Sequence, residues 1–168
     1  VFSGPFENTA ANRLLVETMA ATLSGNLHRT LREDEGGTYG VNVDSRFSKY
    51  PTQEYQISIG FACDPARVKE LTDAAWNEIR TFAERGPSAE FLAGVRKQMD
   101  RELENGYEEN ADLLNDLMES IEYGEDIATV FDRKALYDQL SVPALRTAAR
   151  DFLNLKRYVQ VTLRPEAK

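Results

Sequence analysis

The sequence LREDEGGTYG, residues 31–40, separates a long apolar-striped segment from a segment in which apolar and polar residues alternate. Across residues 8–33 apolar side chains recur at helical spacing, which predicts one long helix with a buried stripe. The stripe comprises Leu15, Met19, Leu23, Leu27 and Leu31, with Val16 and Ala20 beside it. Asn8 or Thr9 is the expected N-cap. Gly36 and Gly37 are expected to end the helix, because glycine tolerates a positive φ.

Downstream, two alternating segments predict an antiparallel hairpin whose connection is the polar stretch 49–53. The apolar residues of each strand share one face: Tyr39, Val41 and Val43, then Tyr55, Ile57, Ile59 and Phe61. Five more helices are predicted from caps and apolar spacing. Their apolar residues are Val68, Leu71, Ala75, Ile79 and Phe82; Leu92, Val95, Met99 and Leu103; Leu113, Leu117 and Ile121; Ile127, Val130, Phe131 and Tyr137; Leu145, Ala149 and Phe152. Val159, Val161 and Leu163 predict a last strand.

This order contains a hairpin instead of strand–helix–strand alternation. It therefore predicts an α+β fold, with helices packed on one face of an antiparallel sheet, in a single domain over residues 1–168. A sheet of three strands is small for so many helices. The opening residues 1–5, VFSGP, have the character of a strand end. We therefore expect an N-terminally truncated fragment, whose sheet edge is completed by upstream residues or by another chain.

The composition is that of a globular protein, with 42% hydrophobic and 29% charged residues. No apolar run approaches the roughly 20 residues that span a bilayer. The net charge of −8 argues against nucleic-acid binding, because phosphate contacts need a basic surface. Eleven acidic residues against one arginine lie within 98–126. We interpret them as a solvated helix face; a cation site is the alternative, but no calcium-binding loop pattern is present.

The chain contains one histidine, His28, and one cysteine, Cys63. A zinc motif with two histidines is therefore impossible within the chain, and a serine–histidine–aspartate triad would rest on His28 alone. We interpret His28 as a surface or boundary residue and Cys63 as a small core residue. Glycine-rich phosphate-binding motifs are absent from the sequence.

Arg32 and Tyr39 remain as candidates for chemistry, seven residues apart across the glycine turn. A guanidinium at a helix end can simply offset the unpaired carbonyls, and a tyrosine that opens a strand can be a half-buried aromatic. Both side chains are also hydrogen-bond donors. Together they could hold a peptide carbonyl or a developing oxyanion.

The stretch 26–43, NLHRTLREDEGGTYGVNV, resembles the C-terminal domain of the pitrilysin-type zinc metallopeptidases, family M16, and most of all that of bacterial zinc proteases. The likeness extends over the strand 55–61, the Asp-Pro turn, the helix start GPSAEFL and the closing VTLRP. In this family an N-terminal domain carries the zinc motif H-x-x-E-H. The C-terminal domain supplies an arginine and a tyrosine that hold the substrate backbone.

The resemblance implies that Arg32 binds substrate and that Tyr39 binds substrate and takes part in catalysis. It also implies that Gly37, Thr38 and Gly40 shape the turn. We expect a substrate-binding domain of a zinc endopeptidase that acts on peptide or unfolded polypeptide. Its zinc would be held by upstream M16 domains of the same chain, with no metal ligand in this fragment, which alone would be inactive. Family resemblance favours the periplasm or cell envelope. The alternatives are a non-catalytic M16-like module for assembly or peptide binding, and an unrelated acidic interaction domain.

Overall fold

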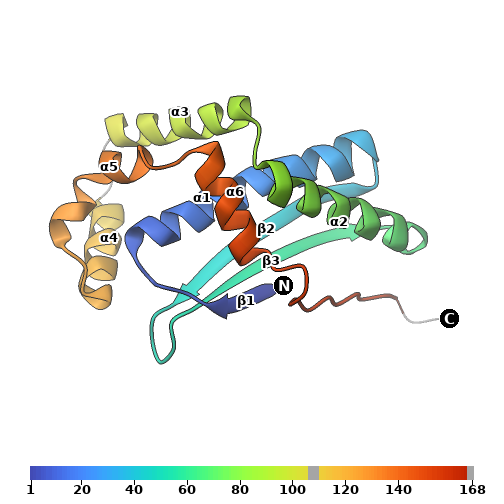
Figure 1. The fold of residues 1–168 in the computed structure, drawn as a ribbon, viewed down its shortest axis with the longest axis horizontal. Coiled ribbons are helices and arrows are strands. Elements are labelled where there is room, and N and C mark those ends of the chain that lie inside the picture. The colour runs from blue at the N-terminus through green and yellow to red at the C-terminus, as the bar shows by residue number, and fades with distance from the viewer. Residues whose placement is uncertain (106–109, 166–168) are drawn as a thin grey trace.

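A layer of helices covers one face of a three-stranded antiparallel sheet in the computed structural model, which describes residues 1–105 and 110–165 (Figure 1). The strands are β1 (Phe2–Pro5), β2 (Thr38–Ser48) and β3 (Glu54–Cys63), in the order β1-β3-β2. The predicted α+β class and the predicted hairpin are confirmed. Residues 1–5 do have strand character, since β1 pairs with β3 from Phe2 opposite Ile57 onward.

The helices begin close to the predicted caps. They are α1 (Ala10–His28), α2 (Val68–Arg85), α3 (Ala89–Asn105), α4 (Asn110–Tyr123), α5 (Arg133–Tyr137) and α6 (Val142–Phe152). Thr9 is the N-cap of α1, where its hydroxyl accepts the Asn12 N–H at 3.2 Å. Ser141 caps α6 in the same way, with the Ala144 N–H at 3.3 Å.

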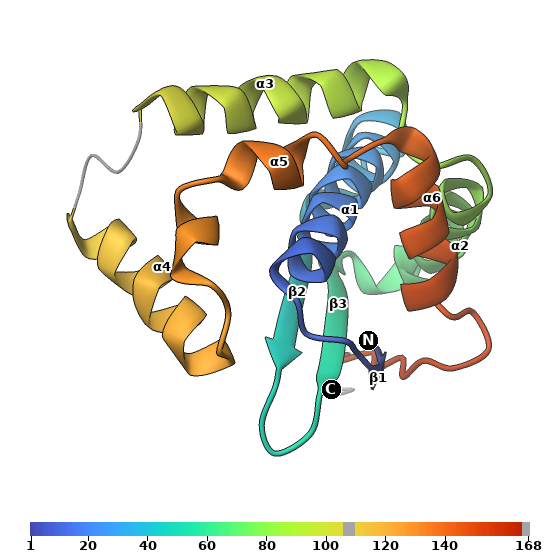
Figure 2. The ribbon, with the colours of Figure 1, turned by 60° about the vertical axis from the view of Figure 1, so that its left-hand side comes forward.

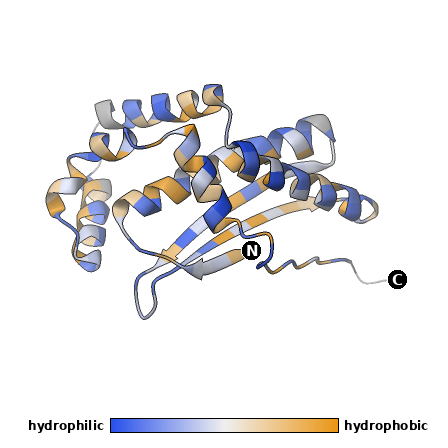
Figure 3. Cartoon of the chain, in the orientation of Figure 1, coloured by the Kyte–Doolittle hydropathy of each residue, from blue (hydrophilic) through white to orange (hydrophobic). Residues whose placement is uncertain are grey.

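The core lies between α1 and the sheet, closed by α2 and α6. The predicted stripe of α1 is fully buried at Val16, Met19, Leu23, Leu27 and Leu31, whereas Leu15 is only partly buried. Hydrophobic colour runs along α1 and in alternating bands on β2 and β3 (Figure 3). Burying a leucine of this kind contributes about 1.5–3 kcal/mol, so α1 is the element on which the other layers assemble.

Two contacts join the outer helices to this core. The ring of Phe91 in α3 lies against Gly25 of α1, where the Cβ of any larger residue would come within 2.2 Å of the ring. Only glycine leaves room for that approach. At the end of α6 the hydroxyl of Tyr55 donates to the Phe152 carbonyl at 2.9 Å. Burial raises the pKa of Tyr55, so the phenol stays protonated and keeps this bond.

Two local predictions were wrong, those of the fifth helix and of the last strand. The expected fifth helix is a 3₁₀ turn, Ile127–Val130, followed by the short α5. Ile121, one of the apolar residues from which the helix α4 was predicted, is 65% exposed, because α3 and α4 extend as an arm from the layer of α1, α2 and α6 (Figure 2). Residues 159–163 form no strand; Val159 makes backbone hydrogen bonds to Val1, and the pairing does not continue beyond it. The side chain of Leu103 lies outside the described residues.

Candidate functional site

The last turn of α1 widens before it reaches the sheet. Residues Arg29–Asp34 form a π-helical turn, in which the Glu35 N–H donates to Thr30 O at 3.1 Å. The Gly37 N–H then reaches back to Leu31 O, also at 3.1 Å. Gly36 allows this closure with a φ of 59°, in the left-handed region. Short π-helical turns inside α-helices often mark functional sites.

Side chains of α2 hold this turn in place. The Glu78 carboxylate accepts from Asn26 Nδ2 at 2.9 Å and from the Thr30 hydroxyl at 3.4 Å. At the start of α2, Arg67 donates to the Glu35 carbonyl at 3.1 Å. The hydrogen bond from Arg67 to Glu70 lowers the pKa of the Glu70 carboxyl, which keeps Glu70 charged beside Arg67. Neither anchor uses Arg32 or Tyr39.

Gly37 and Gly40, the two glycines expected to shape the turn, differ in the space around them. A Cβ on Gly37 would lie 2.5 Å from Cδ2 of Leu71, which is fully buried, so this position has no space for a side chain. Around Gly40 no atom lies within 4 Å of such a Cβ. Positive φ belongs to Gly36 alone within this turn. The prediction that both Gly36 and Gly37 supply it was therefore right for one of them.

The pairing of β2 with β3 is irregular at the first residues of β2. Thr38 pairs with Cys63 and Val41 with Phe61, so Tyr39 and Gly40 together oppose one residue of β3. The Thr38 hydroxyl lies 2.7 Å from Ala62 O and 2.9 Å from Gly40 O, which fixes the irregular strand start. Bulges of this kind re-aim side chains and are frequent next to active sites. Here the Tyr39 side chain is 96% exposed.

Arg32 is also exposed, and its guanidinium nitrogen Nη1 lies 3.1 Å from Nε2 of His28. Because a guanidinium can only donate, the His28 nitrogen is the acceptor in this contact. This contact was missed at the sequence level, although the spacing of four residues on one helix face would have indicated it. His28 thus orients Arg32 and leaves its remaining N–H groups directed to solvent.

Arg32 and Tyr39 lie on either side of the Gly36–Gly37 turn, at the same corner of the fold. No hydrogen bond or ring contact joins them within the described part of the chain. The alternative that Tyr39 is a half-buried strand aromatic is wrong, since its ring is almost entirely in solvent. The corner can therefore present one phenol and one guanidinium to a carbonyl or carboxylate ligand.

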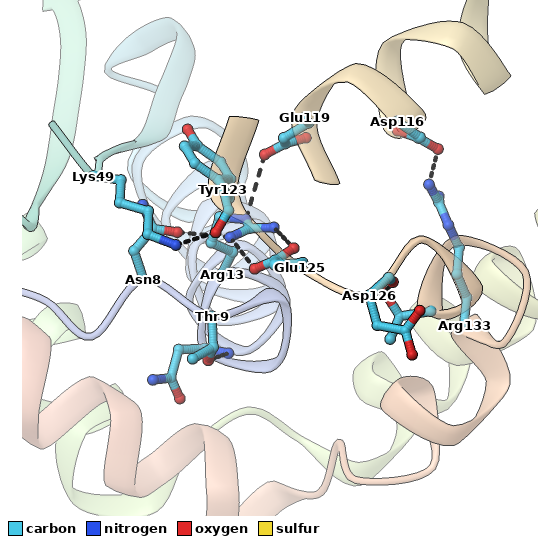
Figure 4. A network of polar contacts seen from close by, with 12 residues as sticks. Asn8, Thr9, Arg13, Lys49, Asp116, Glu119, Tyr123, Glu125, Asp126 and Arg133 are labelled. Atoms are coloured by element: carbon cyan, nitrogen blue, oxygen red, sulfur yellow. Dashed lines mark hydrogen bonds and ion pairs between the residues drawn. The ribbon is translucent and has the colours of Figure 1, made fainter. Parts of the chain in front are cut away.

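A second charged cluster lies at the other end of α1 (Figure 4). Arg13 donates from Nη1 and Nη2 to the two carboxylate oxygens of Glu125, at 2.9 and 2.8 Å. It also donates to Asn8 Oδ1 at 2.6 Å, lies 3.4 Å from a Glu119 oxygen and covers the ring of Tyr123 at 4.7 Å. Burial alone lowers the pKa of Arg13, but the bond and charge of Glu125 outweigh it and raise that pKa.

This Arg13 cluster ties the end of α4 to the body of the fold. Lys49, in the connection of the hairpin, donates to the Tyr123 carbonyl, and Asp116 of α4 forms an ion pair with Arg133 of α5. The acidic segment is thus partly neutralised by arginines distant in sequence, and is not only a solvated face. Because Arg13 already has partners around its guanidinium, the cluster is a structural tether.

The described residues do not fit a zinc site. His28 and Cys63 are the single histidine and cysteine of the chain, and the ring of His28 is bonded to Arg32. Within residues 1–105 and 110–165, no three histidine, cysteine or carboxylate side chains converge in a way that could hold a metal ion. Cys63 is free and packs partly buried against the core, as interpreted from the sequence. Among the helices described, none is long and apolar enough to cross a membrane.

The chain is similar to domains of known M16 zinc proteases. The sequence profile of the Peptidase M16 inactive domain matches residues 2–99. The probable zinc protease PqqL of Escherichia coli is 26% identical over 144 residues, which cover 84% of this chain and 15% of that protein. A PQQL-like zinc protease of Arabidopsis thaliana is 32% identical over 85 residues, 48% of this chain and 9% of that protein.

Solved structures show the same fold at low sequence identity. The periplasmic protease PqqL from Escherichia coli superimposes with a TM-score of 0.77 and 20% identity, over 90% of this chain and 17% of that one. A peptidase M16 inactive domain from Pseudomonas fluorescens gives a TM-score of 0.76 and 17% identity, over 93% of this chain and 38% of that one. The chain therefore spans about a sixth of the length of the E. coli protein.

Proposed function

The chain belongs to the family of peptidase M16 inactive domains, and from that premise we propose that it is the substrate-binding domain of a zinc-dependent endopeptidase. The observation that carries the proposal is Tyr39, which is 96% exposed on an irregular strand start beside an exposed Arg32. A large aromatic side chain gains no burial energy in that position. Its exposure is accounted for if the phenol contacts a ligand.

In this proposal the two side chains bind the backbone of a peptide. The guanidinium of Arg32, oriented by His28, offers a planar set of donors to carbonyl oxygens of the bound segment. The Tyr39 hydroxyl donates one hydrogen bond to the reacting carbonyl, and this bond strengthens as negative charge develops on that oxygen. The turn between them is held by Glu78 and Arg67, which keeps in place the backbone that carries both side chains.

The rest of the active site is proposed to lie in other M16 domains of the complete protein. Because the described residues do not fit a zinc site, the metal and its ligands would come from such a domain, and this chain alone would be inactive. The substrates would be peptides or unfolded polypeptides; a ferredoxin protease, FusC, is among the solved structures with the same fold. The likeness to a periplasmic protease supports a place in the periplasm or cell envelope.

A non-catalytic module for peptide binding or assembly is the second candidate. It is favoured by the match to an inactive domain. In that case Arg32 and Tyr39 would hold a peptide that no site cleaves. The two candidates differ in one measurable property, which is turnover by the complete protein.

The test is peptide hydrolysis by the complete protein and its variants. We expect Tyr39→Phe to lower kcat by about 10²–10³, the usual loss when one oxyanion donor is removed. Arg32→Lys is expected to raise KM as well, because it keeps the charge but loses the planar fork. Two controls match these changes: Tyr50→Phe alters an exposed tyrosine in the hairpin connection, and Arg85→Lys an exposed arginine in the last turn of α2.

Wild-type turnover in Tyr39→Phe would contradict the catalytic role of that residue. If the complete protein cleaves no peptide yet binds one, and Arg32→Lys weakens that binding while Arg85→Lys does not, the non-catalytic module is correct. Melting curves of each variant exclude unfolding as the cause of any loss.

A further inference from the structure

The arm of α3 and α4 presents an apolar helix face to solvent (Figure 2). On α4, Leu114, Met118 and Ile121 are 56%, 59% and 65% exposed. Their spacing of four and three residues places them on one face of the helix, which we call the arm patch. Ile127 and Phe131, in and just after the 3₁₀ turn that packs against α4, are 45% and 67% exposed.

The polar side of α4, not the arm patch, faces the body of the fold. An amphipathic helix usually turns its apolar face to the core and its polar face to water. On α4, however, Asp116, Glu119 and Ser120 line a cavity of about 190 Å³ against α1. The carboxylates of Asp116 and Glu119 form ion pairs with Arg133 and Arg13 (Figure 4). These pairs hold α4 with its carboxylates inward and leave the arm patch outside.

The arm patch contributes nothing to the described core. None of its three side chains belongs to the core formed by the described residues or packs against it. Large apolar side chains gain free energy when they leave water, and several together on a surface mark an interaction site. Anchors at positions i, i+4 and i+7 of one helix are typical of a helix face that docks on another surface.

The charges along this part of the arm have one sign. Residues 110–132 contain seven acidic residues and no lysine or arginine. The seven are Asp112, Asp116, Glu119, Glu122, Glu125, Asp126 and Asp132. Glu122 and Asp126 are exposed, and neither forms an ion pair with another described residue. A complementary surface must therefore be apolar at its centre and positively charged at its rim.

We propose that the arm patch is the docking surface for another domain of the complete protein, whose facing surface combines apolar side chains with lysines at the rim. A second copy of the chain fits poorly, because its own acidic rim would face the first. A separate protein fits poorly too, because the patch would be bare whenever that protein dissociated. The chain spans about a sixth of the length of the E. coli protein PqqL, so a protein of that length has further chain to cover the patch.

This inference rests on one part of the proposed function, the presence of other M16 domains in the complete protein. It does not depend on the Arg32–Tyr39 corner, which lies at the other end of α1. Peptide hydrolysis therefore does not test it, and a structural readout is required.

The three methionines of the chain provide that readout. Met118 lies in the arm patch, Met19 is fully buried on α1, and Met99 of α3 packs partly buried against the core. Hydrogen peroxide oxidises a methionine sulfur according to its access to solvent. Oxidation of each residue is followed by mass spectrometry in the chain 1–168 and in the complete protein, with free methionine as the reference. Slow oxidation of Met19 reports that the chain alone is folded.

We expect Met118 of the complete protein to be oxidised at least about tenfold more slowly than free methionine, and Met118 of the chain 1–168 within about threefold of it. A carbodiimide joins a carboxylate to an amine that contacts it. In the complete protein it should link Glu122 or Asp126 to a lysine of another domain in the same polypeptide.

Two matched variants add a second measurement. Met118→Gln and Met99→Gln make the same change, to a residue of similar length and helix propensity. In the chain 1–168, Met118→Gln should keep the Tm within about 1 °C, since the side chain is in water, whereas Met99→Gln should lower it. In the complete protein both variants should lower the Tm.

Rapid oxidation of Met118 in the complete protein would overturn the proposal, as would the absence of any link within one polypeptide. Protection that requires a high protein concentration would indicate a second copy instead, and protection that requires an added protein would indicate a separate partner. An inactive protein with a protected Met118 would contradict the proposed catalysis alone. An active protein with an accessible Met118 would contradict the docking surface alone.

Discussion

The two ends of α1 carry arginines in opposite situations. Arg13, near the N-terminus, has an 11% exposed side chain and is bonded to Glu125, Asn8 and Glu119. Arg32, in the π-helical turn that continues α1, is exposed and contacts His28. The same residue type therefore serves as a tether at one end and as an open donor at the other.

The difference follows from how each guanidinium is satisfied. A buried charge is tolerated only when partners replace the lost water, and removing one partner leaves the other uncompensated. An exposed charge keeps its water and contributes little to stability. The stability of the fold should therefore depend on the Arg13 cluster, and ligand binding on the Arg32–Tyr39 corner. Substitutions at each end test this difference between the two arginines.

The largest effect on stability is expected from Arg13→Met. It leaves Glu125 without its bidentate partner at a site where that side chain is 17% exposed. Breaking a buried pair from one side typically costs about 3–5 kcal/mol. The free energy of unfolding, from urea denaturation, measures this cost. The double variant Arg13→Met/Glu125→Met should recover a good part of it, since no unpaired charge remains; a double variant as unstable as the single one would contradict the tether.

Gly37→Ala should have an intermediate effect. The new methyl group would meet the Leu71 side chain at 2.5 Å and also approach Arg67, so α2 must shift away from the turn. Overpacking of this kind costs about 1–3 kcal/mol. Gly40→Ala is the matched control three residues on, with open space around its Cβ position, and should change stability by less than about 0.5 kcal/mol. Equal losses in the two variants would show that the close contact at Gly37 is unimportant.

The smallest effects are expected at the corner itself. Arg32→Ala and Tyr39→Phe remove exposed groups that hold no other element in place, so each should change the free energy of unfolding by less than about 0.5 kcal/mol. Chemical denaturation of both variants beside Arg13→Met gives the comparison directly. A loss of about 2 kcal/mol or more in either variant would mean that the corner is part of the scaffold after all.

Local pattern was sufficient for much of the fold. The stripe of α1 and the alternation in residues 39–43 and 55–61 depend on neighbours in sequence, and both gave the right element. The N-caps Thr9 and Ser141 could be predicted for the same reason. Arg32 and Tyr39 could be singled out because no structural need explains both of them at a glycine turn.

Other features depend on residues far apart in the chain. Arg13 and Glu125 are separated by 112 positions, so no local pattern could pair them. The exposure of Ile121 depends on where the arm of α3 and α4 lies, although its helical spacing is correct. The segment 159–163 has the alternation of a strand but lacks a continuous neighbour. The π-helical turn was missed because a stripe through Leu31 looks the same in a regular helix.

The position of Trp76 provides an optical reporter. It is the single tryptophan of the chain, and its ring lies 6.0 Å from that of Phe2 and 4.4 Å from that of Tyr158. Two segments distant in sequence, at Phe2 and at Tyr158, therefore contact one fluorophore on α2. Its emission follows the joining of the two chain ends, while far-ultraviolet circular dichroism follows the helices. Recorded together during denaturation, the two signals distinguish detachment of the ends from melting of the helical layer, without any label.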